Sequence, residues 1–230
     1  ITNPKEEDIL SVAHAKTFEE AEKNLNTEIK NKGLEKVYKE IELPLVPIIK
    51  KAEDHGILLD VLELKKLSVK YHEKLTALEK KIWELAGQEF NINSPKQLGE
   101  ILFDKLNLTA KGLKKTAGGA RSTRESELLK MKEGNPIIEE LLSYREIQKL
   151  LSTYIDALPE LVDKEGQPAQ TTDVVRSGRL HTHLNQTGTT TGRMSSSEPN
   201  LQNIPASGDI AKEIRKTFID DYDLYHPVTN

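Results

Sequence analysis

The chain has 230 residues, which is long enough for one or two domains with a hydrophobic core. Apolar residues make up 36% and charged residues 30% of it, with neither an apolar run of membrane-spanning length nor a secretory signal pattern, so we expect a cytoplasmic protein with no membrane partner. The absence of cysteine excludes disulfides and thiolate metal sites. The first residue is Ile1 rather than Met, which indicates that the chain begins inside a longer gene product or has been processed.

The N-terminal part of the chain is predicted to be helical. A weak apolar stripe predicts a helix within residues 6–32. A second helical pattern follows, in which Pro44 and Pro47 should cause a break or kink near position 43 and which Gly56 should end.

The clearest helix is predicted over residues 60–86, where apolar side chains recur at steps of three and four and charged residues fill the other face. A polar loop is expected over 164–178 and a strand over 178–186. These elements indicate a fold that is mainly α with a small antiparallel β element. The remaining helices are predicted over residues 95–106, 125–132, 136–161 and 210–218.

A basic stretch lies between two of the predicted helices, at residues 105–124, and contains no acidic residue. The formal net charge of −4 argues mildly against nucleic-acid binding, but phosphate contacts require a local basic patch and not a positive total. Gly118 and Gly119 would let this loop follow a phosphate backbone, and a merely solvated loop is the alternative. Its cations are Lys105, Lys111, Lys114, Lys115, Arg121 and Arg124.

The most informative segment is residues 191–205, which read TGRMSSSEPNLQNIP. It offers almost no aliphatic surface for burial, so its order must depend on polar interactions. Arg193 supplies a fork of donors, while Asn200, Gln202 and Asn203 each supply a donor and an acceptor. This is the chemistry that reads phosphates, sugars and base edges.

This segment resembles the TGR…SS.PNLQNIP signature of family A DNA polymerases, the bacterial DNA polymerase I type. The resemblance extends over residues 34–219 and includes FNINSPKQLGEILFDKLNL at 90–108, KKTAGGARST at 114–123 and YREIQKLLSTYIDALPELV at 144–162. It implies a DNA-directed DNA polymerase, a nucleotidyltransferase that adds deoxynucleotides to a primer in replication or repair.

The resemblance also implies a division of the chain into parts of a polymerase. The helical thumb would be followed by the beginning of an α+β palm. The expected parts are the tail of an exonuclease-like region or a linker at 1–33, connecting helices at 34–89, the thumb at 90–162 and an incomplete palm at 163–230.

The resemblance places Arg193 in the DNA minor groove beside the primer end, where it touches acceptors that every base pair presents. It places Asn200 and Gln202 against the minor groove and backbone, although these amides and that of Asn203 can instead satisfy backbone groups within a turn. The face of the 136–161 helix that carries Arg145 and Lys149 would line the DNA, unless intrahelical ion pairs with Glu139 or Glu146 occupy it. The remaining predicted DNA-binding residues are Thr191, Ser195, Lys111, Lys114, Lys115, Arg121 and Ser122.

The sequence departs from the family pattern after the signature. No DYSQIE-type motif follows Phe218, since Asp220, Asp221 and Asp223 do not match it, and Ser207 stands where the family commonly has arginine. The fingers helix and second catalytic aspartate are also absent, so no catalytic or metal residue is assigned. His181 and His183 alternate on a predicted strand but have no third ligand at a recognisable spacing.

We therefore expect Mg²⁺ to serve only the complete polymerase, with none bound by this chain, and deoxynucleoside triphosphates to bind only there. Primer-template DNA is the expected partner, and the isolated chain should be inactive. The alternative is a non-catalytic, truncated DNA-binding product or one half of a split polymerase that pairs with a C-terminal half.

Overall fold

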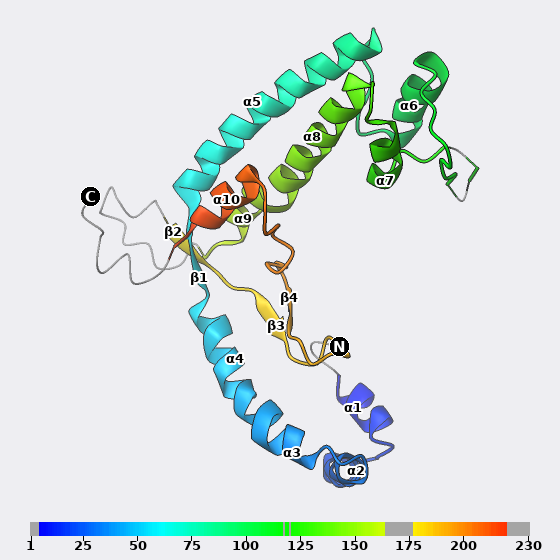
Figure 1. Cartoon of the computed structure of the whole chain (residues 1–230). Coiled ribbons are helices and arrows are strands. Elements are labelled where there is room, and N and C mark those ends of the chain that lie inside the picture. The colour runs from blue at the N-terminus through cyan, green and yellow to red at the C-terminus, as the bar shows by residue number, and fades with distance from the viewer. Residues whose placement is uncertain (1–4, 117, 120, 164–176, 220–230) are drawn as a thin grey trace, which may run out of the picture.

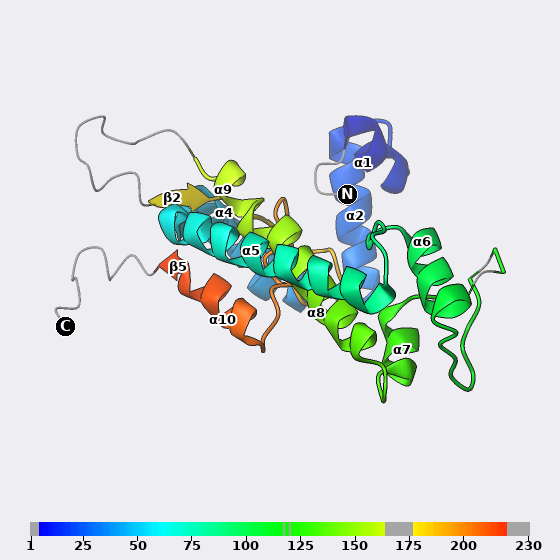
Figure 2. The same cartoon turned by 90° about the horizontal axis from the view of Figure 1, so that it is seen from above.

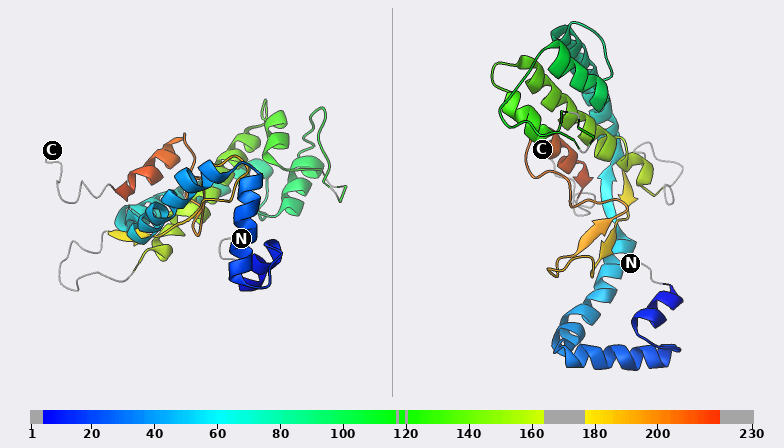
Figure 3. Two further views of the ribbon diagram at one scale, coloured as in Figure 1. Left: turned by 90° about the horizontal axis from the view of Figure 1, so that it is seen from below. Right: turned by 90° about the vertical axis from the view of Figure 1, so that its right-hand side faces the viewer.

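The computed structural model describes residues 5–116, 118–119, 121–163 and 177–219. Asp220, Asp221 and Asp223 therefore lie outside the described residues, as does most of the loop expected at 164–178. The molecule is elongated (Figure 1): the long helices α5 and α8 form an arm, α6 and α7 lie at its far end, and α1 to α4 extend from the other end. The views in Figure 3 show the same separation of the two ends.

The region 6–32, in which one helix was expected, contains two helices. Helix α1 spans Glu6–Val12 and α2 spans Phe18–Asn31, with the side chain of Thr17 capping α2 by accepting from the Glu20 backbone N–H at 3.2 Å. Next come α3 (Glu35–Val37), the π-helical turn η1 (Tyr38–Glu42) and α4 (Leu43–His55).

The expected break near position 43 is instead a change of helix type. Pro44 lies in the first turn of α4, where a missing N–H is tolerated, and Pro47 lies inside the helix. The wider π turn η1 ends at Glu42, just before these prolines, so the chain stays helical as it approaches them. Gly56, at φ 66°, ends the helix as predicted.

The arm is built from α5 (Val61–Ala86) and α8 (Pro136–Leu150), which pack side by side (Figure 2). The Asp60 side chain caps α5 by accepting from the Glu63 N–H at 2.8 Å, and Gly87 ends it in the left-handed conformation. The single helix predicted over 136–161 is divided: α8 continues into the π turn η4 (Leu151–Ile155), and α9 (Leu158–Leu161) begins one residue before Pro159, which cannot donate to the helix ladder.

The far end of the arm consists of short helices around a compact core. Helix α6 spans Pro95–Gly99 and continues as the π helix η2 (Glu100–Lys105), which together match the predicted helix 95–106. Helix α7 (Glu125–Leu128) and the 3₁₀ turn η3 (Leu129–Met131) match the helix predicted at 125–132. We call this end the tip.

Two small sheets lie at the base of the arm. In the first, β1 (Ile57–Asp60) is central, with β2 (Ser177–Leu180) and β5 (Phe218–Ile219) antiparallel on its two sides. In the second, β3 (His183–Asn185) and β4 (Ser195–Ser197) form a hairpin. The predicted strand 178–186 is thus two strands, because the chain leaves one sheet after β2 and enters the other at β3. The expected fold class, mainly α with a small antiparallel β element, is confirmed.

Two hydrophobic clusters occupy the ends of the arm, and Leu75 and Leu78 of α5 pack against both. The base cluster joins α5 to η4, α9 and α10 (Asp209–Lys216). Within the described part of the chain, no helix combines the length and apolar character needed to cross a membrane. The most deeply buried side chains of the base are Leu59, Leu64, Leu158, Leu180 and Ile214, and those of the tip are Ile82, Leu98, Leu102, Leu128, Ile138 and Leu141.

A polar clamp fastens α10 to α5. The Nζ of Lys70 donates to both carboxylate oxygens of Glu213 at 2.8 Å, and the buried Tyr71 hydroxyl donates to Glu213 at 3.0 Å. The hydrogen bond from Lys70 lowers the pKa of Glu213 from its ordinary value. The clamp holds α10 against the base from which β5 extends.

Replacing Glu213 with glutamine should lower the free energy of unfolding by about 1 kcal/mol at neutral pH, because the charge-assisted bonds are lost. A carboxyl whose folded pKa is depressed stabilises the fold above its unfolded pKa, and that stabilisation disappears as the pH falls through the folded value. The difference from wild type should therefore shrink below about pH 4 in urea titrations. Glu73→Gln, an exposed position on α5, is the matched control; an equal loss there would contradict the clamp.

Candidate nucleic-acid interface

The signature segment begins in the turn of the β3–β4 hairpin. Gly192 adopts φ 76° just before Arg193, a conformation that favours glycine. The Thr189 hydroxyl donates to the Arg193 carbonyl at 2.6 Å and fixes the backbone there. The Arg193 side chain is exposed, and within the described part of the chain no hydrogen bond or ion pair engages its guanidinium.

Ser196 organises the centre of the segment. It is buried, its hydroxyl accepts from the Leu201 backbone N–H at 3.1 Å, and it lies 3.3 Å from the side-chain oxygen of Asn200. Sequence reasoning missed this role, which the middle position in a run of three serines does not reveal. In the structure, strand alternation leaves only the central residue of β4 buried, but three identical serines carry no sequence signal of which one that is.

Two apolar side chains anchor the segment while its amides lie outside. Leu201 and Ile204 pack against the base cluster. The Asn200 side chain accepts from the Gln202 N–H at 3.1 Å, and Gln202 donates to the Met194 carbonyl at 3.0 Å, so both amides satisfy local backbone groups. The exposed amide of Asn203 has no such partner among the described residues.

Asn203 lines a groove of about 500 Å³ between the signature segment and α8. Arg145 and Lys149 line it from α8, so the fold brings together three predicted site residues that are far apart in sequence. Glu125, Glu139 and Glu146 also line it, so the groove is electrostatically mixed and not a uniformly basic channel.

The two cations of α8, Arg145 and Lys149, differ in burial and in hydrogen bonding. Arg145 is half-buried, and its Nη1 donates to the Thr123 carbonyl at 2.5 Å, which ties α8 to the end of the basic stretch. Burial lowers the pKa of its guanidinium from the ordinary value. Lys149 is exposed and unpaired within the described residues, and Glu139 pairs with Lys132 at 3.3 Å. The intrahelical ion pairs considered as the alternative are therefore not formed in the described part.

The basic stretch at the tip contains both exposed lysines and residues that are bound within the protein. Lys111, Lys114 and Lys115 are exposed, and their ammonium groups form no hydrogen bond or ion pair among the described residues, although the charge of Lys114 interacts with that of Glu127. Arg121 instead pairs with Asp104 and lies over the Phe103 ring, 4.6 Å from its centroid. Ser122 is buried and accepts from the Arg124 N–H at 3.3 Å. Asp104, one residue before the acid-free stretch, was the sequence signal for the pairing of Arg121.

The segments that carry the free cations border one open side of the molecule. In Figure 1 the loop at the tip, helix α8 and the signature segment between β4 and α10 all face the concave side of the arm. Thr191 and Ser195 lie in or beside the hairpin turn, where the Thr191 hydroxyl contacts that of Thr189 at 3.4 Å.

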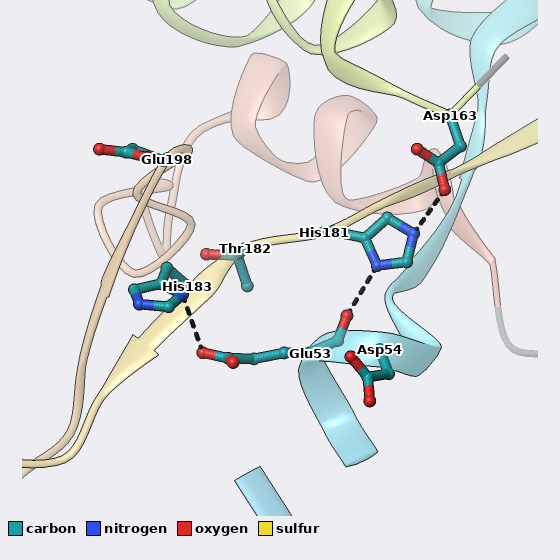
Figure 4. Close-up of a pocket in the computed structure, with 7 residues that line it drawn as sticks. All are labelled: Glu53, Asp54, Asp163, His181, Thr182, His183 and Glu198. Carbon is teal, nitrogen blue, oxygen red and sulfur yellow. Dashed lines mark hydrogen bonds and ion pairs between the residues drawn. The ribbon is translucent and has the colours of Figure 1, made fainter. Parts of the chain in front are cut away.

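The two histidines form part of a structural link and not a ligand set (Figure 4). His181 Nδ1 lies 2.6 Å from the Glu53 carbonyl, and its Nε2 lies 2.9 Å from the Asp163 carboxylate. His183 Nδ1 lies 3.2 Å from the Glu53 carboxylate, which also accepts from the Leu184 N–H at 2.6 Å. These contacts attach the strand segment to the end of α4. Among the described residues, no group of three potential ligands can hold a metal ion.

Comparison with known proteins gives the family. Residues 61–226 match the model of a family described as DNA polymerase family A. The chain belongs to this family. The matched range includes the arm, the tip and the signature segment.

Relatives in DNA polymerase family A match most of the chain. It is 45% identical over 183 residues to the thermostable DNA polymerase I of Thermus aquaticus, covering 80% of this chain and 21% of that protein. It is 46% identical over 190 residues to DNA polymerase I of Synechocystis, covering 83% of this chain and 18% of that protein. The chain thus spans about a fifth of the length of these relatives.

A solved family structure shares the fold. The POL domain of Pol1 from M. smegmatis, in complex with DNA primer-template and dNTP, matches with a TM-score of 0.74 and 31% identity. The match covers 86% of this chain and 33% of that chain.

Replacing Ser196 with alanine should lower the free energy of unfolding by about 1–2 kcal/mol, because the Leu201 N–H loses its partner in a buried place. Urea titration gives the stability, and amide exchange at Leu201 shows whether the loss is local. Ser197→Ala is the matched control, since that hydroxyl has no partner among the described residues, and it should change stability by less than about 0.5 kcal/mol. Equal effects of the two substitutions would contradict a central role for Ser196.

Proposed function

We propose that this chain is the part of a family A DNA polymerase that grips the primer-template duplex and contacts its minor groove during template-directed DNA synthesis in replication or repair. The observation that carries the proposal is that two segments with free cations, the hairpin turn that contains Arg193 and the tip loop that contains three lysines, lie on the same side of the arm. Membership of the family, and a solved relative in complex with DNA primer-template and dNTP, support it.

The proposed role of each residue follows from whether its side chain is already bound within the protein. Lys111, Lys114 and Lys115 contact phosphates, which sets affinity without reading sequence. Arg193 contacts the acceptors that all base pairs share in the minor groove, and Asn203 with Lys149 faces the duplex from the groove beside α8. Asn200 and Gln202 hold the turn that presents these groups and reach DNA with their remaining donors and acceptors.

The proposed parts of the polymerase are the thumb at 90–162 and the beginning of the palm at 163–230. Residues 34–89 connect to the base of the thumb, and residues 1–33 are an exonuclease-side tail or linker. The thumb so defined includes the tip, α8, η4 and α9, and the tip and the first part of α8 share the tip cluster.

Catalysis belongs to the complete polymerase in this proposal, together with deoxynucleoside triphosphates and a divalent metal ion, Mg²⁺, in the cytoplasm. Among the described residues, no group of three carboxylates or histidines is arranged so that it could hold a metal ion. We therefore assign them no step in metal chemistry. A non-catalytic DNA-binding product or a split-polymerase half is distinguished by primer extension with and without a complementing C-terminal chain.

DNA binding by the chain should be independent of sequence and should weaken steeply with salt, because phosphate contacts release counterions. Replacing Lys111, Lys114 and Lys115 together with alanine should make the slope of log affinity against log salt shallower by about 0.9 for each phosphate that is no longer neutralised. Fluorescence anisotropy with a labelled primed duplex gives both slopes.

The matched control replaces three exposed lysines of the N-terminal helices: Lys30, Lys50 and Lys51. It removes the same charge from helices α2 and α4, away from the tip (Figure 1), so it should leave the slope nearly unchanged. A flat salt response of the wild-type chain, or equal changes in the two triple variants, would contradict the tip as a DNA grip.

In a complete polymerase that contains this chain, Arg193→Ala should lower incorporation far more than duplex affinity. Many cations share the electrostatic grip, whereas a misplacement of the primer end by one ångström costs on the order of a hundredfold in rate. Single-turnover incorporation and equilibrium DNA binding are measured for the same variant.

Two further variants sharpen this test. Arg193→Lys should not restore the rate, since an ammonium lacks the planar fork, and Lys149→Ala should lower affinity and rate by similar small factors. Full rescue by lysine, or equal losses in affinity and rate for Arg193→Ala, would make Arg193 one phosphate contact among many.

A further inference from the structure

The loop that carries the three tip lysines is fastened to α7 by one buried carboxylate. Glu127 accepts from the Lys114 backbone N–H at 3.0 Å and from the Lys130 Nζ at 2.7 Å. Lys130 in turn donates to the Gly112 carbonyl at 2.9 Å. A single ion pair therefore holds the backbone at two places within the lysine-bearing stretch.

The environment of Glu127 differs from that of a surface ion pair. Its side chain is only 3% exposed, while that of Lys130 is 36% exposed. Its neighbours Leu128 and Met131 are buried in the tip cluster, so the carboxylate is presented by a rigid element. The hydrogen bonds from Lys130 and from the Lys114 backbone lower the pKa of Glu127 from its ordinary value.

The other side of the loop completes the attachment. The Ser122 N–H donates to the Lys114 carbonyl at 3.0 Å, and Lys115 and Arg121 form an isolated antiparallel bridge. Leu113 packs against the tip cluster between the two attachment points. The backbone of this stretch is thus fixed while the ammonium groups of Lys111, Lys114 and Lys115 stay exposed.

We propose that Glu127 is a positioning residue for DNA binding, which holds the loop so that Lys111, Lys114 and Lys115 meet a phosphate backbone without first being ordered. The inference rests on the proposed function of the tip. A loop that is ordered before binding loses less conformational entropy when it contacts DNA. Lys130, which donates to Glu127 and to the Gly112 carbonyl, serves this attachment and not the DNA.

Because Glu127 is negatively charged, the direction in which DNA affinity changes on its removal tests the inference. Removing a carboxylate beside a DNA-binding surface ordinarily raises DNA affinity, because the surface becomes more positive. If Glu127 positions the lysines, its removal lowers affinity in spite of the added positive charge. Glu133 provides the matched control: it is an exposed acid of the same tip, and its carboxylate has no partner among the described residues.

The experiment uses the whole 230-residue chain as wild type, Glu127→Ala, Glu127→Gln and Glu133→Ala. Anisotropy with a labelled primed duplex gives affinity and salt slope, and hydrogen exchange without DNA gives the protection of the Lys114 amide. Circular dichroism selects a temperature at which every variant is folded. Glu127→Gln keeps the size of the side chain and one acceptor oxygen, so it provides a folded test if the alanine variant unfolds.

We expect Glu127→Ala to weaken DNA binding by about threefold to tenfold and to make the salt slope shallower, with Glu127→Gln intermediate. Protection of the Lys114 amide should fall in the same order, and Glu133→Ala should bind DNA as tightly as wild type or more tightly. A purely structural role would reduce thermal stability and leave the salt slope of the folded protein unchanged.

Two results distinguish failure of the positioning role from failure of the proposed DNA grip. If wild type shows salt-dependent binding and Glu127→Ala binds as tightly as Glu133→Ala, the positioning role is wrong while the DNA grip stands. If wild type binds no DNA, the proposed function and the positioning role fail together, and amide exchange still reports whether Glu127 holds the loop. Unchanged protection of Lys114 in Glu127→Ala overturns the attachment itself.

Discussion

The packing of α5 against α8 is the interaction on which the rest of the structure depends. Helix α5 has 26 residues and is therefore about 39 Å long, which sets the distance between base and tip. Its apolar stripe contributes to the base cluster at one end and to the tip cluster at the other, and Leu75 and Leu78 join the two. Burial of each large aliphatic side chain contributes roughly 1.5–3 kcal/mol, so this seam fixes both ends relative to one another.

The structure divides the basic residues into those that hold the fold and those that remain free for a ligand. Arg121 is committed to Asp104, Arg145 to the Thr123 carbonyl and Lys130 to Glu127. Each of these contacts lies at the tip or joins α8 to it, so the committed cations build the surface on which the free ones stand. Such a division explains how a chain with a net charge of −4 can present cations on one side.

Much of the fold follows from local signals in the sequence. Helix α5 has nearly the predicted bounds, because the Asp60 cap and Gly87 that delimit it each act within one helical turn. The π turns η1, η2 and η4 were not predicted, because they depend on tertiary packing. The division between β2 and β3 was not predicted either, because it depends on which strand pairs with β1. At the site, Arg193 and the tip lysines are recognisable by type and motif. The hydrogen bonds of Arg145, Ser196 and Glu127 could not be recognised from the sequence, because their partners lie on separate elements or are backbone groups.

The order of the signature segment shows how a polar stretch is kept in one conformation at low apolar burial. Leu201 and Ile204 use the core of the neighbouring arm, while Ser196 and Asn200 satisfy backbone N–H groups inside the segment. The amides that stabilise the turn are therefore also the ones that the family resemblance places against DNA. A group with both a donor and an acceptor can serve both purposes, since one is used internally and the other stays exposed. A carboxylate has only acceptors and an ammonium group has only donors, so neither could replace the amides of Asn200 and Gln202 in both roles.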